Sequence, residues 1–273
     1  MNIIAVGDNV ADCYLDQKLF YPGGNAVNVA VNCKRYGFDK SAYIGIFGND
    51  EKAEHIKWAL DKEGVSYERS RCMLGISGQP RVNLTQEGDR VFVGGPKNTV
   101  QHTVRLRLTP DDLDYISKFD VCHTSCYSSI EQELLNIKKF CDISFDFSDY
   151  KYEDYLKKVC PNIKFAFFSG SSLELEEIKD IIRKCHELGT EIVGVTRGGK
   201  GALFSKNGEI FEQSIKETEI VDTMGAGDSF IAGFLTSYLD SKDMVKSLDF
   251  AADCAAKTCT FHGGFGYPHP FNE

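Results

Sequence analysis

The segment 222–228 reads Asp-Thr-Met-Gly-Ala-Gly-Asp, and its residue types and spacing suit the transfer of a charged group. The small residues Gly225, Ala226 and Gly227 let backbone amides approach a ligand without interference from a side chain. A helix expected over 227–239 begins at the same place, and a helix N-terminus favours negative charge. The segment therefore predicts an anion hole suited to the oxygens of a transferred phosphoryl group.

Asp228 places a carboxylate at the same helix start. A carboxylate there could accept the proton of an attacking hydroxyl, and general-base catalysis of this kind contributes roughly 10²–10⁴ in rate. The alternative is that Asp228 only interacts favourably with the helix dipole from the first turn. The complete segment 222–228 favours the role of catalytic base.

These groups need a scaffold to hold them, and the alternation of apolar and helical segments predicts one. Strands are expected at 3–6, 42–47, 119–123, 143–147, 165–168 and 192–196. Helices are expected at 25–36, 51–63, 111–117, 129–139, 174–188, 227–239 and 243–261. This order predicts an α/β fold of three α/β/α layers with a mostly parallel central sheet, formed as a single domain over 1–273.

Two stretches interrupt the alternation. The first, 13–21, is short and strand-like, and the second, 79–93, alternates polar and apolar residues around a turn at 86–89. Together they predict a small β lid outside the main sheet. A separate hairpin over 202–213 is expected to turn at Asn207-Gly208.

Charge and composition narrow the choice of partners. The net charge of −9 and the lack of a basic run make nucleic acid and anionic membranes poor candidates. No window approaches the ~18 apolar residues of a membrane-spanning helix, and the first residues read as a buried strand rather than a signal peptide. The ten cysteines are scattered without a CxxC pair, which favours reduced thiols. We therefore expect a cytoplasmic protein.

The segment 222–228 resembles the carboxy-terminal signature of the PfkB, or ribokinase-like, carbohydrate kinases. The segment 23–30, Gly-Gly-Asn-Ala-Val-Asn-Val-Ala, is similar to the other signature of that family. Residues 35–37 and 45–50 follow the same pattern, and the resemblance covers nearly the whole chain. It implies a ribokinase-like fold and transfer of the γ-phosphoryl group of ATP to a sugar hydroxyl, with Mg²⁺ as a further cofactor.

The resemblance also implies roles for individual residues. Asp228 would be the base, and Gly225, Ala226 and Gly227 would form the anion hole. A second set would bind the sugar near the first strand and the first helix, namely Asp8, Asp12, Gly23, Gly24, Asn25 and Asn28. Without the family, the aspartates could be turn residues and the Gly-Asn segment a capped helix start.

The turn over 196–201, Thr-Arg-Gly-Gly-Lys-Gly, resembles the nucleotide-contacting turn of the family. The resemblance implies ATP contacts from Thr196, Gly198 and Gly201. This turn is not a Walker A loop, because the GxxxxGK[ST] spacing is missing.

Relatives carry Asn-x-x-Glu after a central strand, whereas here Ser171 replaces the Asn and Glu174 keeps the acid. By resemblance, Ser171 would contact ATP and Glu174 would bind Mg²⁺ through water. The alternative is that the two residues form a capping box for the helix expected over 174–188. Asp222 and the carbonyls near 263–266 correspond to a monovalent-cation site in many relatives, so the resemblance suggests K⁺ as well.

Within the family, the stretches 23–37, 146–149, 222–235 and 255–258 are similar to kinases that act on fructoselysine. The similarity implies phosphorylation of fructoselysine, or of a related fructosamine, at the 6-hydroxyl. Arg81 on the predicted lid could meet the carboxylate of such a substrate, or it could be a solvated surface residue.

Other functions stay open on the sequence alone. A kinase of the same family could act on another simple sugar, a sugar phosphate or a nucleoside. A non-catalytic sugar-binding regulator is a different class, but the presence of Asp228 and its glycines argues against it. A dinucleotide-dependent dehydrogenase is disfavoured, because residues 7–12 lack the GxGxxG pattern. The lid often forms a dimer contact in relatives, so a homodimer through the lid is a further expectation.

Overall fold

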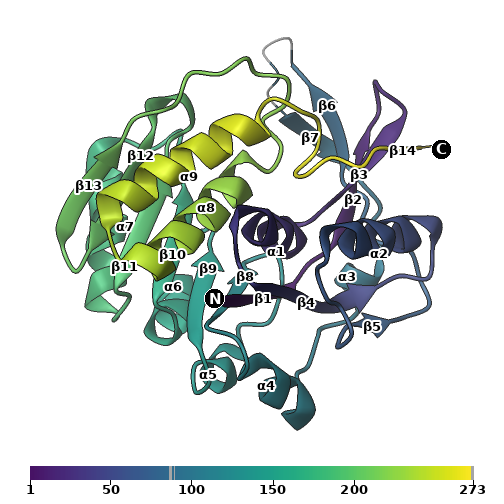
Figure 1. Cartoon of the computed structure of the whole chain (residues 1–273), viewed down its shortest axis with the longest axis horizontal. Helices are drawn as coiled ribbons and strands as arrows, with labels where there is room; N and C mark the ends of the chain where they lie inside the picture. Colours follow the sequence, from purple (N-terminus) through teal and green to yellow (C-terminus); the bar gives the residue numbers. More distant parts are fainter. Residues whose placement is uncertain (86–87, 89, 272–273) are drawn as a thin grey trace.

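The computed structural model describes residues 1–85, 88 and 90–271, and their strands and helices alternate along the chain as predicted. Figure 1 shows a large central sheet flanked by helices and a smaller sheet at its side. Within the described residues, the central sheet has the spatial order β13-β12-β11-β10-β9-β8-β1-β4-β5. Its strands are β1 Asn2–Gly7, β4 Lys40–Phe47, β5 Arg71–Cys72, β8 Val121–Ser125, β9 Asp142–Asp146, β10 Phe165–Ser169, β11 Ile192–Thr196, β12 Ala202–Lys206 and β13 Glu209–Gln213.

Most neighbouring strands of the central sheet are parallel. β1 pairs with β4 and β8, and the parallel run continues through β9, β10 and β11. β12 and β13 add an antiparallel hairpin, whose turn has positive φ at Asn207 (52°) and Gly208 (94°), as a type I′ turn requires. Because parallel strands end at the same edge of a sheet, the side chains that follow them can meet there.

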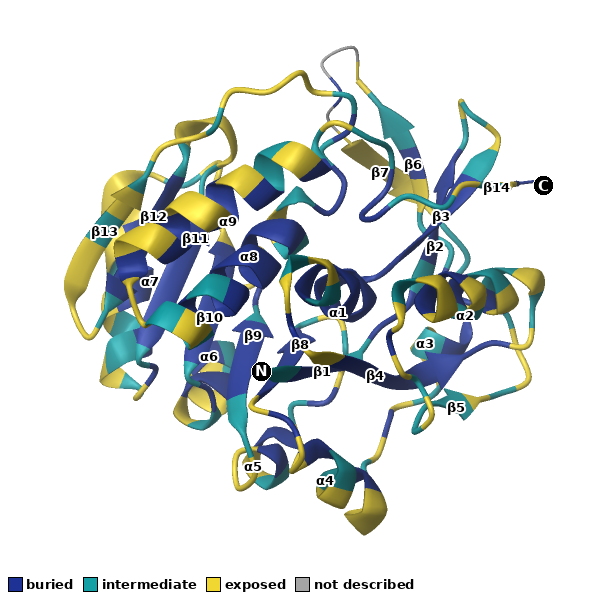
Figure 2. Ribbon diagram, in the orientation of Figure 1, coloured by how far each residue is buried: buried dark blue, intermediate teal, exposed yellow. Residues whose placement is uncertain are grey.

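Helices cover both faces of the central sheet, which gives the three predicted layers. One face packs on α1 Asn25–Tyr36, α2 Glu51–Glu63, α8 Ala226–Ser241 and α9 Met244–Thr258. The other packs on α4 Pro110–Ile116, α5 Leu134–Ile137, α6 Glu153–Val159 and α7 Leu175–Glu187. The connections contain a short helix and two 3₁₀ turns, which are α3 Val100–Thr103, η1 Cys160–Asn162 and η2 Gly198–Lys200. Figure 2 shows the inner strands of the central sheet buried between these two layers of helices, whereas the edge strand β13 is largely exposed.

None of the helices in the described part of the chain has both the length and the apolar character needed to cross a membrane.

Local sequence signals fix several helix ends. α1 begins after Gly24 (φ 102°) and ends at Gly37 (φ 121°), and glycine adopts such angles at little cost. At the start of α4, the Thr109 hydroxyl accepts a hydrogen bond from the Asp112 amide, while the Asp112 carboxylate accepts one from the Thr109 amide. This capping box satisfies two amides that lack partners inside the helix.

Two predicted elements differ from the structure. The helix expected over 129–139 is helical only within α5, because Ser129 adopts a positive φ of 53° and the chain turns before the helix begins. The strand expected at 119–123 lies instead at 121–125, because Phe119 still belongs to the turn that follows α4.

The smaller sheet has the order β14-β3-β2-β6-β7 within the described residues. Its strands are β2 Val10–Tyr14, β3 Leu19–Gly23, β6 Arg81–Leu84, β7 Arg90–Gly94 and β14 His269–Pro270. The stretch predicted at 13–21 therefore falls within a pair of strands rather than one, and the pairing of β14 with β3 has no counterpart in the predictions. Of the turn predicted at 86–89, residues 86, 87 and 89 lie outside the described residues.

The two faces of the smaller sheet carry different apolar clusters. On one face, Tyr14 and Val82 pack with Met224, which belongs to the segment predicted to carry the chemistry. On the other face, Cys13 and Phe20 belong to a separate cluster. The first face of the smaller sheet therefore lies against the 222–228 segment.

Candidate active site

The start of α8 brings the two signature segments of the sequence together. Asn25 Nδ2 donates a hydrogen bond to one oxygen of the Asp228 carboxylate (2.7 Å), and Asn28 Nδ2 donates one to the other (2.7 Å). Both asparagines lie in the first turn of α1, three residues apart, so their side chains project from the same face of the helix. Residues separated by two hundred positions in the sequence therefore hold one carboxylate from both sides.

Gly225 shapes the turn that presents the amides of α8. It is the N-cap residue and adopts the left-handed conformation (φ 73°). A Cβ atom on Gly225 would lie 2.5 Å from the Cα of Gly264, so the close approach of the two backbones also requires glycine. The first amides of α8 have no carbonyl one turn earlier inside the helix. The Ala226 amide makes a long hydrogen bond to the Thr223 carbonyl (3.3 Å) just before the helix, and an anion at this helix N-terminus would compete for it.

Burial sets the protonation behaviour of Asp228. It raises the pKa of this carboxyl to about 6, while the hydrogen bonds from Asn28 and Asn25 oppose the rise. A carboxyl with this pKa is mostly ionised at neutral pH. Because its pKa is only about one unit below neutral pH, the carboxylate is also basic enough to accept a proton. These are the properties expected of a general base.

A buried histidine orients Asn25. The amide nitrogen of Asn25 is a donor to Asp228, so its Oδ1 must be the acceptor towards His123 Nε2 (2.9 Å). His123 Nε2 then carries the ring proton, and Nδ1 accepts from the Ser144 hydroxyl (2.9 Å). Burial lowers the pKa of His123 to about 3, which keeps the ring neutral. Sequence reasoning assigned no role to His123 beyond its place in a predicted strand.

We expect His123→Leu to lower kcat about 10-fold, because Asn25 loses the donor that fixes its orientation and the buried amide oxygen is left without a partner. The same change should move the acid limb of the pH–rate profile to higher pH, since the Asn25 hydrogen bond lowers the pKa of Asp228. His123→Gln, which keeps a side-chain donor, should recover part of the rate. A leucine variant with an unchanged pH profile would contradict this positioning role.

Asp8 and Asp12 both lie near the start of α1, but they have different surroundings. The Asp8 carboxylate accepts from the Asn25 amide (2.8 Å) and the Ser128 hydroxyl (3.3 Å), so it caps α1 from outside the helix. Asp12 is only 4% exposed, and it accepts no hydrogen bond from the described residues. Burial and then the charge of Asp228 raise the pKa of Asp12 to about 7. Asp12 therefore has acceptor capacity available for a ligand.

The predicted sugar-binding glycines adjoin these aspartates. A Cβ atom on Gly23 would lie 2.1 Å from Asp12 Oδ2, and one on Gly24 would lie 2.9 Å from the Asp8 carbonyl oxygen. Side chains at these two positions would therefore displace Asp12 and the connection between β1 and β2 that contains Asp8. The structure brings together the whole set proposed for the sugar, with Asp228 at one end.

Asp146 is a site residue that sequence reasoning missed. It ends β9, and its Oδ2 accepts a hydrogen bond from Asn25 Nδ2 (2.8 Å), the same nitrogen that donates to Asp228. Its Oδ1 accepts from the Ser148 amide (2.8 Å). Burial and then the charge of Asp228 raise its pKa to about 7. Two signals were available, namely its position near the end of the strand predicted at 143–147 and its place in the stretch 146–149 that is similar to relatives.

The arginine that reaches the site is Arg90 rather than Arg81. Arg90 Nη1 donates to the carbonyl of Thr223 (3.0 Å). Burial raises the pKa of both Asp12 and Asp228, and the positive charge of Arg90 opposes that rise. Arg81 pairs in register with Cys13, on the face of the smaller sheet opposite to Tyr14. The structure does not bring Arg81 to the carboxylate cluster.

The residues predicted to contact ATP form a second group. The Gly170 amide donates to the Thr196 carbonyl (2.8 Å), and a Cβ atom on Gly198 would lie 3.7 Å from that of Ser171. Gly201 has a φ of 82°, and a side chain there would meet the backbone of β13. The ends of β10 and β11 thus place Ser171 beside the 196–201 turn.

Glu174 is exposed and is itself the N-cap residue of α7. Its amide donates to the carboxylate of Glu177 (3.0 Å). The alternative interpretation, in which Ser171 caps this helix, is therefore wrong. In the described part of the chain, no group of three or more His, Cys, Asp or Glu residues could hold a metal ion. Contact of Glu174 with Mg²⁺ through water stays a prediction.

Asp222 is fully buried and already has three donors. Its Oδ2 accepts from the Tyr14 hydroxyl (2.5 Å) and the Gly263 amide (2.9 Å), and its Oδ1 accepts from the Met224 amide (2.8 Å). These bonds tie the 263–266 loop to the turn before α8. With these three donors the carboxylate fits a structural role better than the binding of a monovalent cation. The proposed reaction does not require such an ion.

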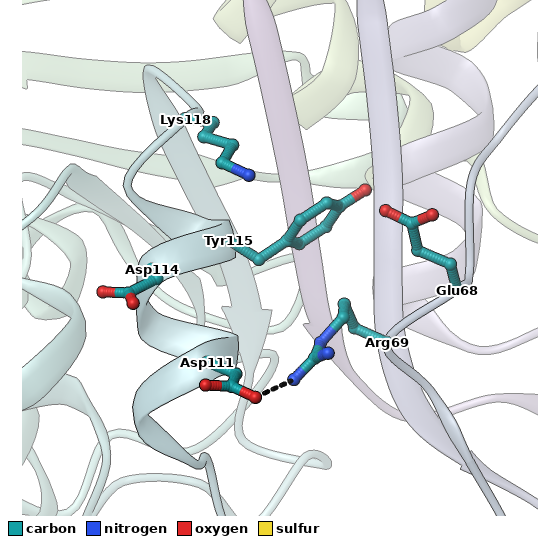
Figure 3. A pocket seen from close by; sticks show the side chains of 6 residues that line it. All are labelled: Glu68, Arg69, Asp111, Asp114, Tyr115 and Lys118. Atoms are coloured by element: carbon teal, nitrogen blue, oxygen red, sulfur yellow. Dashed lines mark ion pairs between the residues drawn. The ribbon is translucent and has the colours of Figure 1, made fainter.

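Two hollows in the surface differ in their relation to this site. One of about 480 Å³ lies between α4 and the residues before β5, where Arg69 and Asp111 form an ion pair (3.8 Å; Figure 3). It is lined by charges of both signs and contains none of the residues discussed above. A narrower one of about 30 Å³ is lined by Gly7, Asp8 and Ser128, so it opens beside the sugar residues.

The fold and this site together define a phosphotransferase with an alcohol group as acceptor. Residues 3–268 match the model of the pfkB family carbohydrate kinases, and the chain belongs to this family. The resemblance of the two signature segments to that family is thereby confirmed.

Similar proteins agree with this assignment. The fructosamine kinase FrlD of Bacillus subtilis (strain 168) is 46% identical over 271 residues, which cover 99% of this chain and 95% of the relative. The fructoselysine 6-kinase of Escherichia coli (strain K12) is 29% identical over 264 residues, which cover 96% and 99%. The structure of Arabidopsis thaliana ribokinase complexed with ribose and ATP superposes with a TM-score of 0.82 at 22% identity, over 96% of this chain and 93% of that one. This similarity confirms the ribokinase-like fold.

Proposed function

We propose that the protein transfers the γ-phosphoryl group of ATP to the 6-hydroxyl of a fructosamine such as fructoselysine, with Asp228 as the base. The observation that carries the proposal is the Asp228 carboxylate held by Asn25 and Asn28 at the N-terminus of α8. The names of the two relatives, a fructosamine kinase and a fructoselysine 6-kinase, support this choice of acceptor.

The transfer follows from the positions of these groups. Asp228 accepts the proton of the 6-hydroxyl as its oxygen bonds to the γ-phosphorus, and the bond from that phosphorus to the bridging oxygen of ADP breaks. The amides of Gly225, Ala226 and Gly227 stabilise the negative charge on the transferred oxygens. Thr196, Gly198, Gly201 and Ser171 hold ATP. Mg²⁺ would neutralise phosphate charge when bound, with Glu174 contacting it through water.

The smaller sheet serves as the lid of the site in this proposal. Its described strands include residues of the predicted lid segments 13–21 and 79–93, and β14 adds to them. Val91, Phe92 and Val93 of the edge strand β7 are each exposed by about half (Figure 2). An edge strand with consecutive exposed apolar residues favours pairing with another chain. We infer a homodimer through the lid, which the molar mass in solution would check.

Coupled release of ADP across a panel of acceptors tests the proposed activity. The panel contains fructoselysine, glucoselysine, fructose, ribose and adenosine, each with ATP and purified protein. We expect the highest kcat/KM with fructoselysine, and product analysis should place the phosphate on the 6-oxygen. Preferred transfer to ribose or adenosine would instead identify a kinase for a simple sugar or nucleoside. Sugar binding with no ADP release for any acceptor would identify a regulator.

We expect Arg90→Ala to lower kcat/KM for fructoselysine about 10-fold. The change removes a positive charge near Asp12 and Asp228 and a hydrogen bond to the turn that carries the anion hole. Arg81→Ala is the matched comparison on the neighbouring strand, measured at the same ATP concentration. A larger rise in KM for fructoselysine with Arg81→Ala than with Arg90→Ala would restore Arg81 as the partner of the substrate carboxylate.

A further inference from the structure

Asp146 is a carboxylate in the active site that the proposed transfer does not use. Asp228 is the base, Asp8 caps α1, and Asp12 is available to sugar hydroxyls. Asp146 remains without a role, although it ends a central strand and contacts the same Asn25 nitrogen as the base. Its side chain is partly exposed, so a ligand can reach it.

The charge around Asp146 is strongly negative. The charged groups that act on it are the carboxylates of Asp228 and Asp8, whereas Arg90 acts on Asp12 and Asp228. Each oxygen of Asp146 accepts one hydrogen bond, from Asn25 or from the Ser148 amide, and a carboxylate oxygen can accept two. Asp146 therefore has an open acceptor position, and it shares the Asn25 donor with a second carboxylate, that of Asp228.

A second observation shows that this part of the site is built for a ligand. The Oδ1 atom of Asn28, whose Nδ2 donates to Asp228, is buried and has no hydrogen-bond partner in the described part of the chain. A buried acceptor without a partner costs free energy unless a ligand supplies the donor. The ligand expected here brings a hydrogen-bond donor to Asn28, a hydroxyl to Asp228 and positive charge to Asp146.

We infer that Asp146 binds the protonated amine of the substrate and thereby selects sugars that carry an amine at C1. The inference rests on the proposed function, because a fructosamine has a secondary amine at C1 and its reacting hydroxyl at C6. In the furanose ring C1 and C6 are attached to C2 and C5, the two carbons that flank the ring oxygen, so the amine and the 6-hydroxyl lie along one edge of the ring. Because Asn25 holds Asp146 and Asp228 near one another, a single ring can present its 6-hydroxyl to Asp228 and its ammonium to Asp146. The N⁺–H···O⁻ contact is a charge-assisted hydrogen bond, stronger than a bond between neutral groups.

The test compares two acceptors that differ in one atom. The first is N-(1-deoxyfructos-1-yl)glycine, and the second is 1-O-carboxymethylfructose, in which an ether oxygen replaces the amine. Steady-state kcat/KM and calorimetric binding are measured for the wild-type protein and Asp146→Asn. Asp149→Asn, which changes an exposed carboxylate three positions away, is the matched control. Asp146→Ser replaces the asparagine variant if the latter is not folded by circular dichroism.

We expect Asp146→Asn to lower kcat/KM for the amine at least ~30-fold and to lower that for the ether no more than ~3-fold. Loss of the contact with Asn25 would damage catalysis for both acceptors alike, so the ratio between them isolates recognition of the ammonium. Binding of the amine should weaken in parallel, and Asp149→Asn should resemble the wild type.

Other results would overturn the inference in distinguishable ways. An equal loss for amine and ether would show that Asp146 only positions Asn25 or binds a hydroxyl. A change confined to the dependence on Mg²⁺ or ATP would place Asp146 on the phosphate side. A wild-type protein that accepts both compounds equally would remove the selection while leaving sugar kinase activity intact. Transfer to neither compound would instead refute the proposed function itself.

Discussion

Asp228→Asn should lower kcat by at least ~10² while ATP and the sugar still bind. The asparagine has nearly the same shape but cannot take the proton of the attacking hydroxyl. Its contacts with Asn25 and Asn28 change as well, because both of these side chains donate to the carboxylate. Rapid-quench measurement of the phosphorylated product, with calorimetric binding of each substrate, separates the loss of chemistry from a loss of affinity.

The matched control for Asp228→Asn is Asp111→Asn, which removes an exposed carboxylate from the first turn of α4. If Asp228 served only the helix dipole, both variants would show a similar small effect. The wild-type rate should also fall as the pH drops through about 6, because Asp228 takes up a proton there and ceases to be a base. Normal turnover by the Asp228→Asn variant would remove the proposed base.

Gly225→Ala should lower kcat by a comparable factor of ~10², for a different reason. The residue has a φ of 73°, and an added Cβ would lie 2.5 Å from the Cα of Gly264. Strain of this kind costs about 1–3 kcal/mol, and backbone atoms cannot move aside as the end of a long side chain can. The turn must therefore shift, and the amides of the proposed anion hole should shift with it. Thermal unfolding should show a lower Tm.

Gly227→Ala separates backbone strain in the turn from interference of an added methyl group with the phosphoryl group. A Cβ on Gly227 meets no heavy atom within 4 Å, and its backbone is not in the left-handed region. The Tm should therefore stay at the wild-type value. Any loss of kcat in this variant would measure interference between the methyl group and the transferred phosphoryl group. A Gly225→Ala variant with wild-type Tm and kcat would contradict the role given to the turn.

The fold could largely be predicted from the sequence, because strands buried on both faces and amphipathic helices leave clear patterns. α1 and α2 have the predicted bounds, and the predicted strands of the central sheet lie within two residues of their expected positions, whereas β5 was not predicted. The prediction of a helix over 129–139 was wrong because the apolar spacing there is helical, whereas Ser129 adopts a conformation that periodicity does not reveal. The place of β14 depends on long-range pairing, which no local pattern encodes.

The site divides in a similar way. Asp228, Asn25 and Asn28 belong to continuous motifs, and the structure places them in contact. His123 and Asp146 contact Asn25 across about a hundred residues of sequence, so only the packed fold reveals them. The sequence also does not show which of two arginines, Arg81 or Arg90, reaches the site. Which of two neighbouring strands presents its arginine to the site depends on register, and the pairing of Arg81 with Cys13 decides it.

The contact between the smaller sheet and Thr223 has a consequence for the timing of the reaction. The Thr223 amide donates to the Gly88 carbonyl (3.2 Å), and its own carbonyl accepts from Arg90 (3.0 Å). Both bonds use the backbone of a residue two positions before Gly225. If the sheet acts as the proposed lid, its movement away from the site to release the product would break both bonds and loosen the turn that carries the proposed anion hole. We therefore expect the open form to be inactive, which would protect ATP from attack by water.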